Sequence, residues 1–363
     1  MSAALVLLLF VLLIVLAFEY INGFHDTANA IATVVSTKVL TPRQALALAA
    51  IMNLIGAFFG SEVAKTMISG IVDGKLVDVS VVFILCTMLS AITWNLLTWW
   101  FGMPSSSSHA LIGSMCGTAL AASHMNWHTL IWSRVKIDAK TGAHSMEGIF
   151  HKVVIPMISS PVLGILIGFL LMGLIFFLIR HWRPHTVNTV FGRLQILSAG
   201  YMGWGHGLAD AQKTMGVITL MLLGATKAGT LNDAPAWLGF LKVNSEAIPA
   251  WVKLVCAFTM AAGTWAGGWK IIKTLGHKMV KMKPVHGFAA ETTAASILFA
   301  TGAMGMPVST THVITTSIMG VGAAKRWGSV KWTLVERIVW AWIFTIPVTA
   351  VLAFGFFKLG ALF

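Results

Sequence analysis

Two short polar segments of the sequence share an order of residues that suits the binding of an oxyanion. They run from Met103 to Gly117 and from Met306 to Gly320, and each has Met-Pro, then a run of hydroxyl side chains, then a histidine. Hydroxyl groups rotate to meet an oxyanion, and a helix N-terminus adds free N–H groups and partial positive charge. The alternative for each hydroxyl taken alone is a helix cap or an interhelical hydrogen bond. The candidate substrate ligands are Ser105, Ser106, Ser107, Ser108, Ser309, Thr310 and Thr311.

A second pair of segments carries a carboxylate. Asp26 lies in segment 23–30, and Asp210 lies in segment 207–214, which matches it in part. A carboxylate beside an anion is repulsive, and its burial in a membrane costs on the order of 3 kcal/mol. The conflict disappears if H⁺, Na⁺ or a divalent metal travels with the anion. We therefore expect both aspartates to take part in cation coupling, with a salt bridge to Lys213 as the alternative for Asp210.

Other polar residues in apolar surroundings are further candidates. Asn29 and Gln212 lie next to the aspartates and could ligate a cation or donate to the anion. Glu291 is an isolated acid in an apolar stretch, which makes it a candidate for cation coupling. A lone histidine in an apolar helix is more often a satisfied interhelical group, although histidine also transfers protons near neutral pH. The sequence leaves open the roles of Glu19, His25, His109, His206 and His312.

The elements that must position these residues are membrane helices. The chain has 363 residues, of which 57% are hydrophobic and only 10% charged, whereas soluble domains have about 25% charged residues. Recurring apolar stretches approach the roughly 20 residues of a helical span, so we expect an all-α, polytopic membrane protein with about ten to twelve helical segments. The net charge of +13 fits basic cytoplasmic loops in contact with lipid rather than nucleic-acid binding. Since residues 1–37 hold no Lys or Arg, we expect the N-terminus outside.

The paired motifs indicate two repeats. We expect a first repeat over residues 1–180, a basic linker over 181–193 and a second repeat over 194–363, with the Asp motif preceding the hydroxyl motif in each. If each repeat crosses the bilayer an odd number of times, the two are inverted, and the substrate site lies near the midplane between broken helices.

Helix breaks are expected in both motifs. Asn22-Gly23 interrupts the first apolar run, and Pro104 and Pro307 interrupt later ones. Two re-entrant helical hairpins follow from the prolines. Their arms are Trp94–Met103 with Ser107–Ala121, and Glu291–Gly305 with Thr310–Gly322.

Together these segments resemble the signature motifs of the inorganic phosphate transporter (PiT) family, and are most similar to the bacterial low-affinity phosphate permeases. The matching segments are 22–30, 103–113, 207–213 and 306–314. The resemblance implies a transporter of the bacterial inner membrane, with an inverted-repeat fold, cation-coupled phosphate uptake and a homodimer. By position it implies that Asp26, Asn29, Asp210, Ser106–Ser108 and Ser309–Thr311 bind phosphate and the cation.

Three departures from the family pattern concern the coupling cation. Ala209 stands where Asn is common, Gln212-Lys213 stands where Na⁺-coupled members repeat Ala-Asn, and Asn53 replaces an acid. Lys213 could supply a fixed positive charge where Na⁺ would otherwise bind. We therefore expect a proton-coupled phosphate symporter with no cofactor beyond the cation, and transport as a metal–phosphate complex stays open.

The alternatives are Na⁺ coupling and a permease for sulfate or another oxyanion. An enzyme is not expected, because a Ser-His-Asp triad needs one nucleophile and one base, and duplication of the whole set would serve no purpose.

Overall fold

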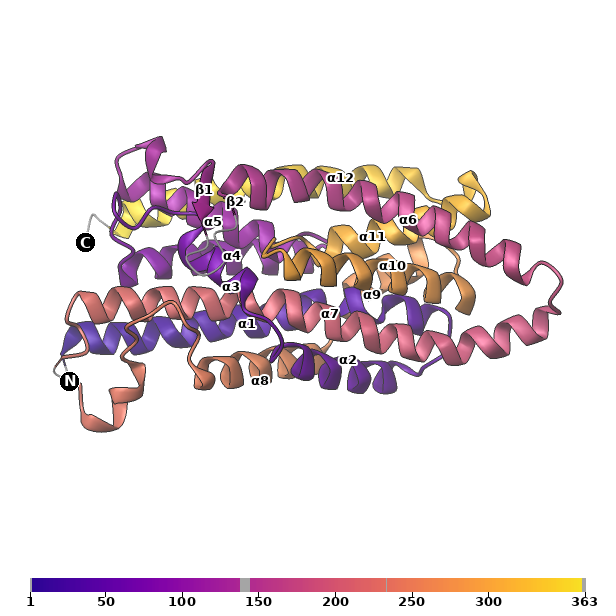
Figure 1. Ribbon diagram of the computed structural model, residues 1–363, viewed down its shortest axis with the longest axis horizontal. Helices are drawn as coiled ribbons and strands as arrows, with labels where there is room; N and C mark the ends of the chain where they lie inside the picture. The colour runs from indigo at the N-terminus through magenta and orange to yellow at the C-terminus, as the bar shows by residue number, and fades with distance from the viewer. Residues whose placement is uncertain (1, 138–143, 233, 361–363) are drawn as a thin grey trace.

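The protein is mostly helical in the computed structural model, which describes residues 2–137, 144–232 and 234–360 (Figure 1). Within these residues the structure contains twelve α-helices, so the expected all-α class is confirmed. The helices are α1 (Ala3–Ser36), α2 (Pro42–Gly56), α3 (Glu62–Ser69), α4 (Val81–Trp100), α5 (Ser107–Ala122), α6 (Ile155–Ile179), α7 (Pro184–Lys227), α8 (Ala250–Ala266), α9 (Trp269–Lys273), α10 (Pro284–Ala303), α11 (Thr310–Lys325) and α12 (Trp332–Gly360). In the described part of the chain, four segments are long and apolar enough to cross a membrane, namely α1, α4, residues 150–178 and α12.

Short elements complete the chain. The 3-10 turns are η1 (Trp127–Thr129), η3 (Ala236–Leu241) and η5 (Trp327–Ser329), and the π-helical turns are η2 (Phe150–Val154) and η4 (Thr274–Met279). Strands β1 (Arg134–Ile137) and β2 (His144–Glu147) pair antiparallel, in the half of the molecule where α1 begins (Figure 1). Burial raises the pKa of Glu147, but hydrogen bonds and charge from Arg134 and Lys136 outweigh it, so the pKa lies below its usual value.

Helices α1 and α7 form the centre of the molecule and run in opposite directions (Figure 1). They have 34 and 44 residues, or roughly 50 and 65 Å at 1.5 Å per residue, which exceeds the roughly 30 Å of the hydrocarbon core. Helix α1 is continuous, so the expected break at Asn22-Gly23 is wrong. Gly23 instead permits close packing, because a Cβ there would lie 2.5 Å from the Met260 carbonyl oxygen of α8.

The second Asp motif shows the same arrangement. Helix α7 is continuous through it, and a Cβ on Gly207 would lie 2.3 Å from the Asn53 carbonyl oxygen of α2. The basic linker expected over residues 181–193 is mostly helical, because α7 begins at Pro184, where proline suits the first helical turn. The division into repeats at 1–180 and 194–363 stays a prediction.

Two helical hairpins meet in the middle of the molecule, as expected from the prolines. Their arms are α4 with α5, and α10 with α11 (Figure 1). Gly102 and Gly305 turn the two tips with the same φ of +64°. The tips touch each other, because Ser108 Oγ donates to the Val308 carbonyl oxygen at 3.2 Å.

Helices from before and after the midpoint of the chain pack on each other in crossed pairs. Helix α1 packs on α8 while α7 packs on α2, and α5 packs on α12 while α11 packs on α6. The hairpin tips are held in matching ways, since Thr66 Oγ1 donates to the Gly305 carbonyl oxygen and Thr274 Oγ1 to the Gly102 carbonyl oxygen. This crossed packing fixes the halves against each other around the hairpin tips.

Candidate functional site

The two Asp motifs meet where α1, α7 and both hairpin tips converge. One oxygen of Asp26, one of Asp210 and a ring nitrogen of His206 lie within 4.8 Å of one another, and all three residues are buried. We call this group of side chains, with the tip residues that contact it, the central cluster. The duplication in the sequence therefore corresponds to two halves of one site.

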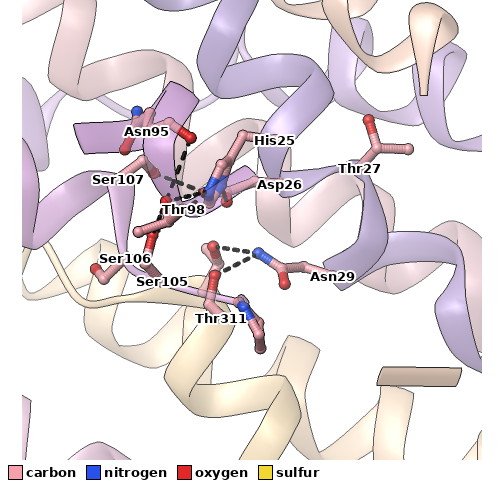
Figure 2. Close-up of polar contacts among 12 residues, drawn as sticks. His25, Asp26, Thr27, Asn29, Asn95, Thr98, Ser105, Ser106, Ser107 and Thr311 are labelled. Carbon is pink, nitrogen blue, oxygen red and sulfur yellow. Dashed lines mark hydrogen bonds and ion pairs between the residues drawn. The ribbon is translucent and has the colours of Figure 1, made fainter. Parts of the chain in front are cut away.

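Asp26 is held by residues of α1 and of the first hairpin (Figure 2). Its Oδ1 lies 2.6 Å from His25 Nδ1, and its Oδ2 accepts from Ser107 Oγ at 2.6 Å. His25 Nε2 lies 3.2 Å from Thr98 Oγ1, which is 2.7 Å from Ser105 Oγ. His25, whose role the sequence left open, thus orients Asp26 against the first hydroxyl run.

Asp210 is paired with a cation. Lys213 Nζ donates to Asp210 Oδ1 and to Ser108 Oγ, and it lies 3.3 Å from the Val308 carbonyl oxygen. Asp210 Oδ2 accepts from Thr310 Oγ1 at 3.2 Å and lies 3.1 Å from His206 Nε2. The salt bridge considered as an alternative for Asp210 is present, and it also connects α7 to both hairpin tips.

Of the two predicted amide ligands, the structure brings only one into the central cluster. Asn29 Nδ2 donates to Thr310 Oγ1 at 3.1 Å and to Thr311 Oγ1 at 2.9 Å, which joins α1 to the second tip (Figure 2). Gln212 is held elsewhere: its Oε1 accepts from the Val63 N–H at 3.0 Å, and its Nε2 donates to the Phe59 carbonyl oxygen at 3.2 Å. Gln212 therefore fastens the turn between α2 and α3, and its side chain is not available to a substrate.

The hydroxyls of each run differ in what they do. Ser106 and Ser309 cap their helices, with Oγ accepting from the N–H of the third residue on, as the capping alternative anticipated. Ser105, Ser107, Ser108, Thr310 and Thr311 instead join the central cluster through the bonds described above. Sequence spacing could not separate these roles, because capping depends on where each helix starts.

Both capped helices begin in the central cluster. The structure, in the residues it describes, gives no acceptor to the backbone N–H groups of Ser107, Ser108, Thr310 and Thr311. Each N-terminus also carries about half a positive charge. Since these four residues are at most 3% exposed, water contributes little screening. The arrangement is suited to an anion that accepts from the free N–H groups.

Glu291 is buried apart from the central cluster, between α10, α1 and α7. Its Oε1 accepts from Thr33 Oγ1 at 2.5 Å and from Gln195 Nε2 at 3.1 Å, and its Oε2 accepts from Ser198 Oγ. These partners carried no signal in the sequence, because single polar residues in apolar helices are common. The carboxyl group is fully hydrogen-bonded but has no cationic partner among the described residues.

The two motif histidines lie in the first turns of α5 and α11 and contact each other. The rings of His109 and His312 are 4.6 Å apart, and that of His312 lies 3.9 Å from the ring of Trp342. Both histidines are buried, and they pack against each other rather than against either aspartate. Their ring contacts are interhelical, but His109 Nδ1 and His312 Nε2 are buried and have no hydrogen-bond partner among the described residues, so neither is a satisfied interhelical group.

Comparison with known proteins agrees with the geometry. Residues 22–353 match the model of the phosphate transporter family (PHO4). The chain is 42% identical to the probable low-affinity inorganic phosphate transporter of Bacillus subtilis over the full length of both, and 40% identical to that of Rhizobium meliloti over 96% and 94% of the two chains.

A solved structure described as the sodium-dependent phosphate transporter has the same fold. Its TM-score to this chain is 0.78 over 98% and 99% of the two chains, at 22% identity. The family indicated by the sequence motifs is thereby confirmed, and its members are transporters rather than enzymes. The chain belongs to the phosphate transporter family.

Proposed function

We propose that the protein is a symporter that imports inorganic phosphate together with protons, and that the central cluster binds the phosphate. The observation that carries this proposal is the pair of helix N-termini with free N–H groups, set among the hydroxyls of both hairpin tips. Phosphate offers several oxygens in a tetrahedral arrangement and can accept from both tips at once. The family membership supports the choice of phosphate.

The charges of the central cluster support coupling to a cation. Asp26 and Asp210 contribute two negative charges, and Lys213 contributes one positive charge. Phosphate adds one or two further negative charges to a site that water hardly reaches. Because desolvated like charges repel strongly, binding requires positive charge to enter with the anion.

Lys213 supports the proton as that cation. Its ammonium group already contacts Asp210, Ser108 and the Val308 carbonyl oxygen, which are oxygens that a bound Na⁺ would use. A mobile metal ion at the same oxygens would be repelled by the fixed ammonium. A proton needs no such ligand shell, since it binds covalently to one carboxylate oxygen.

Phosphate and sulfate differ in what they offer to Asp26 and Asp210. Phosphate at neutral pH carries an O–H that can donate to a buried carboxylate, whereas sulfate has only acceptors. Sulfate would place only acceptor oxygens against these carboxylates, so the facing oxygens would repel with no hydrogen bond between them. We therefore expect phosphate to be preferred.

Import as a metal–phosphate complex is a second candidate. Asp26, Asp210 and His206 supply two oxygens and one nitrogen within 4.8 Å, a ligand set that divalent metals accept. The adjacent Lys213 competes with this arrangement. The role of divalent metal is therefore tested in the same experiment.

The test is uptake of labelled phosphate by the purified protein in liposomes. We expect a proton gradient with the outside more acidic to drive phosphate accumulation without Na⁺ and with EDTA present. Excess sulfate should compete poorly with phosphate. Uptake driven only by Na⁺ would refute proton coupling, and loss of uptake with EDTA would favour the metal–phosphate candidate. Asp26→Asn should abolish accumulation, while the exposed Asp78→Asn serves as the matched control.

The topology in the membrane is also part of the proposal. Arg180, Lys283 and Lys325 line one cavity at the end of the molecule opposite the start of α1 (Figure 1). Because basic residues favour the cytoplasmic side, we place this end inside and the N-terminus outside. The homodimer stays a prediction, which the mass of the protein in detergent would test.

A further inference from the structure

Glu19 is a buried acid with an incomplete set of partners. It lies on α1, two helical turns before Asp26, and its side chain has no exposure to solvent. Its Oε2 accepts from Thr214 Oγ1 of α7 at 2.5 Å, but its Oε1 has no hydrogen-bond partner. Such an atom destabilises the folded protein, because a buried polar group without a partner loses its hydrogen bonds to water and gains none in exchange.

A second unpartnered atom lies beside it. Asn22 is one turn further along α1, on the same face of the helix. Its Oδ1 is buried and also lacks a partner. Glu19 Oε1 and Asn22 Oδ1 are thus two buried acceptor oxygens, one helical turn apart on α1, and neither has a donor among the described residues.

No cation balances Glu19 within the part of the chain that the structure describes. The charged groups of α7 that act on Glu19 are Asp210 and Lys213, which are bonded to each other, and Lys213 also donates to Ser108. From α8 the facing titratable group is Cys256, and α4, which also packs on α1, contains no charged residue. An ionised Glu19 would thus be a buried charge without a counter-ion, which is strongly unfavourable.

A single proton on Glu19 removes the unbalanced charge and supplies a donor for the two unpartnered oxygens. A protonated carboxyl group gains an O–H donor, and an O–H on Oε1 can donate to Asn22 Oδ1. The carboxyl group is then neutral, and both unpartnered oxygens are satisfied. The chemistry of the pair is that of a proton-binding site.

We propose that Glu19, with Asn22 as its hydrogen-bond acceptor, carries the coupling proton at a site separate from the phosphate. This inference rests on the proposed proton coupling and names the residue responsible for it. Thr214 lies one helical turn after Asp210, and Asn22 lies one turn before Asp26. A proton gained or lost at Glu19 therefore acts on both turns that hold the central cluster.

Glu19 gains one proton and loses one proton in each transport cycle. On the outer side, Oε1 of the carboxylate takes a proton from water while phosphate binds, and on the inner side the O–H bond breaks and the proton returns to water. Since Glu19 is fully buried, both transfers require the helices around it to part. Protonation thus accompanies the exchange between outward-facing and inward-facing forms.

The test separates phosphate exchange from proton-driven accumulation in liposomes. Glu19→Gln mimics the neutral acid, so we expect exchange of internal for external phosphate to remain within about threefold of wild type. Accumulation driven by a pH gradient should fall to an inside-to-outside ratio of one. Glu62→Gln, at an exposed residue of α3, is the matched control and should accumulate normally.

The outcomes distinguish the two levels of the proposal. If wild type shows no proton-driven accumulation, the proposed function fails whatever the variant does. If wild type accumulates and Glu19→Gln accumulates equally, the role of Glu19 is overturned. If Glu19→Gln also loses phosphate exchange, infrared spectroscopy of wild type and Glu19→Asp tests whether Glu19 is protonated. We expect a protonated-carboxyl band at neutral pH that shifts in Glu19→Asp, and absence of that band would overturn the inference.

Discussion

Replacement of Lys213 by methionine tests how the central cluster holds an anion. Methionine is similar in length but removes the charge and the bonds to Asp210, Ser108 and the Val308 carbonyl oxygen. Two unit charges about 4 Å apart interact by about 4 kcal/mol at an effective dielectric constant near 20. If half of this is realised with phosphate, the loss is about 2 kcal/mol, or roughly a thirtyfold weaker affinity.

Stability changes in the same variant, for a separate reason. Removing one partner of a buried ion pair costs about 3–5 kcal/mol, because the other charge remains buried. The double variant Asp210→Asn with Lys213→Met removes both charges. We therefore expect it to regain much of the lost thermal stability while its phosphate affinity stays weak.

The assay is phosphate binding to the purified protein in nanodiscs, with thermal unfolding measured on the same samples. We expect Lys213→Met to unfold at a lower temperature and to bind phosphate at least about thirtyfold more weakly. A folded Lys213→Met protein that binds phosphate within threefold of wild type would refute the assignment of Lys213 to the anion site.

Three further predictions concern the stability of the structure outside the central cluster. Gly207→Ala should destabilise the protein by about 1–3 kcal/mol, seen as a lower unfolding temperature, because the added Cβ would overlap the α2 backbone. Gly192→Ala on the same helix, where nothing lies within 4 Å of the added Cβ, should leave the unfolding temperature unchanged. Gln212→Ala should cost about 1–3 kcal/mol, since the Val63 N–H loses its acceptor, while the KM for phosphate stays within twofold; a large rise in KM would restore Gln212 as a substrate ligand. Glu147 has a lowered pKa in the folded protein, so its stabilisation is present above the unfolded pKa and is lost as the pH falls through the folded value. Thermal unfolding should therefore separate Glu147→Gln from wild type at pH 7 and not at strongly acidic pH, and equal unfolding temperatures at pH 7 would contradict this.

Duplication made much of the site predictable from sequence. Asp26 and Asp210 lie far apart in the chain, yet their matching surroundings indicated one site built from two halves, and the structure brings them together. The hairpins were predictable because Pro104 and Pro307 cannot continue a helix. Composition and the recurring apolar stretches of nearly helical-span length were sufficient for the membrane and all-α assignments.

The parts that could not be predicted depend on contacts between distant segments. Gly23 reads as a helix break, but its role is to let α8 approach, and only the position of Met260 reveals this. Gln212 stands next to the Asp motif, but a helix turns by about 100° per residue, so neighbours in sequence face different partners. Phe59, one partner of Gln212, lies on the turn before α3, and Val63, the other, lies in the first turn of α3, so both are outside the motif.

The central claim is that phosphate binds between the N-termini of α5 and α11. The most direct measurement is a cryo-electron microscopy structure of the protein with an electron-dense tetrahedral oxyanion, such as tungstate, that competes with phosphate for binding. The account predicts density within hydrogen-bond distance of the backbone N–H groups of Ser107, Ser108, Thr310 and Thr311. Displaceable density elsewhere, with those N–H groups still free, would contradict it.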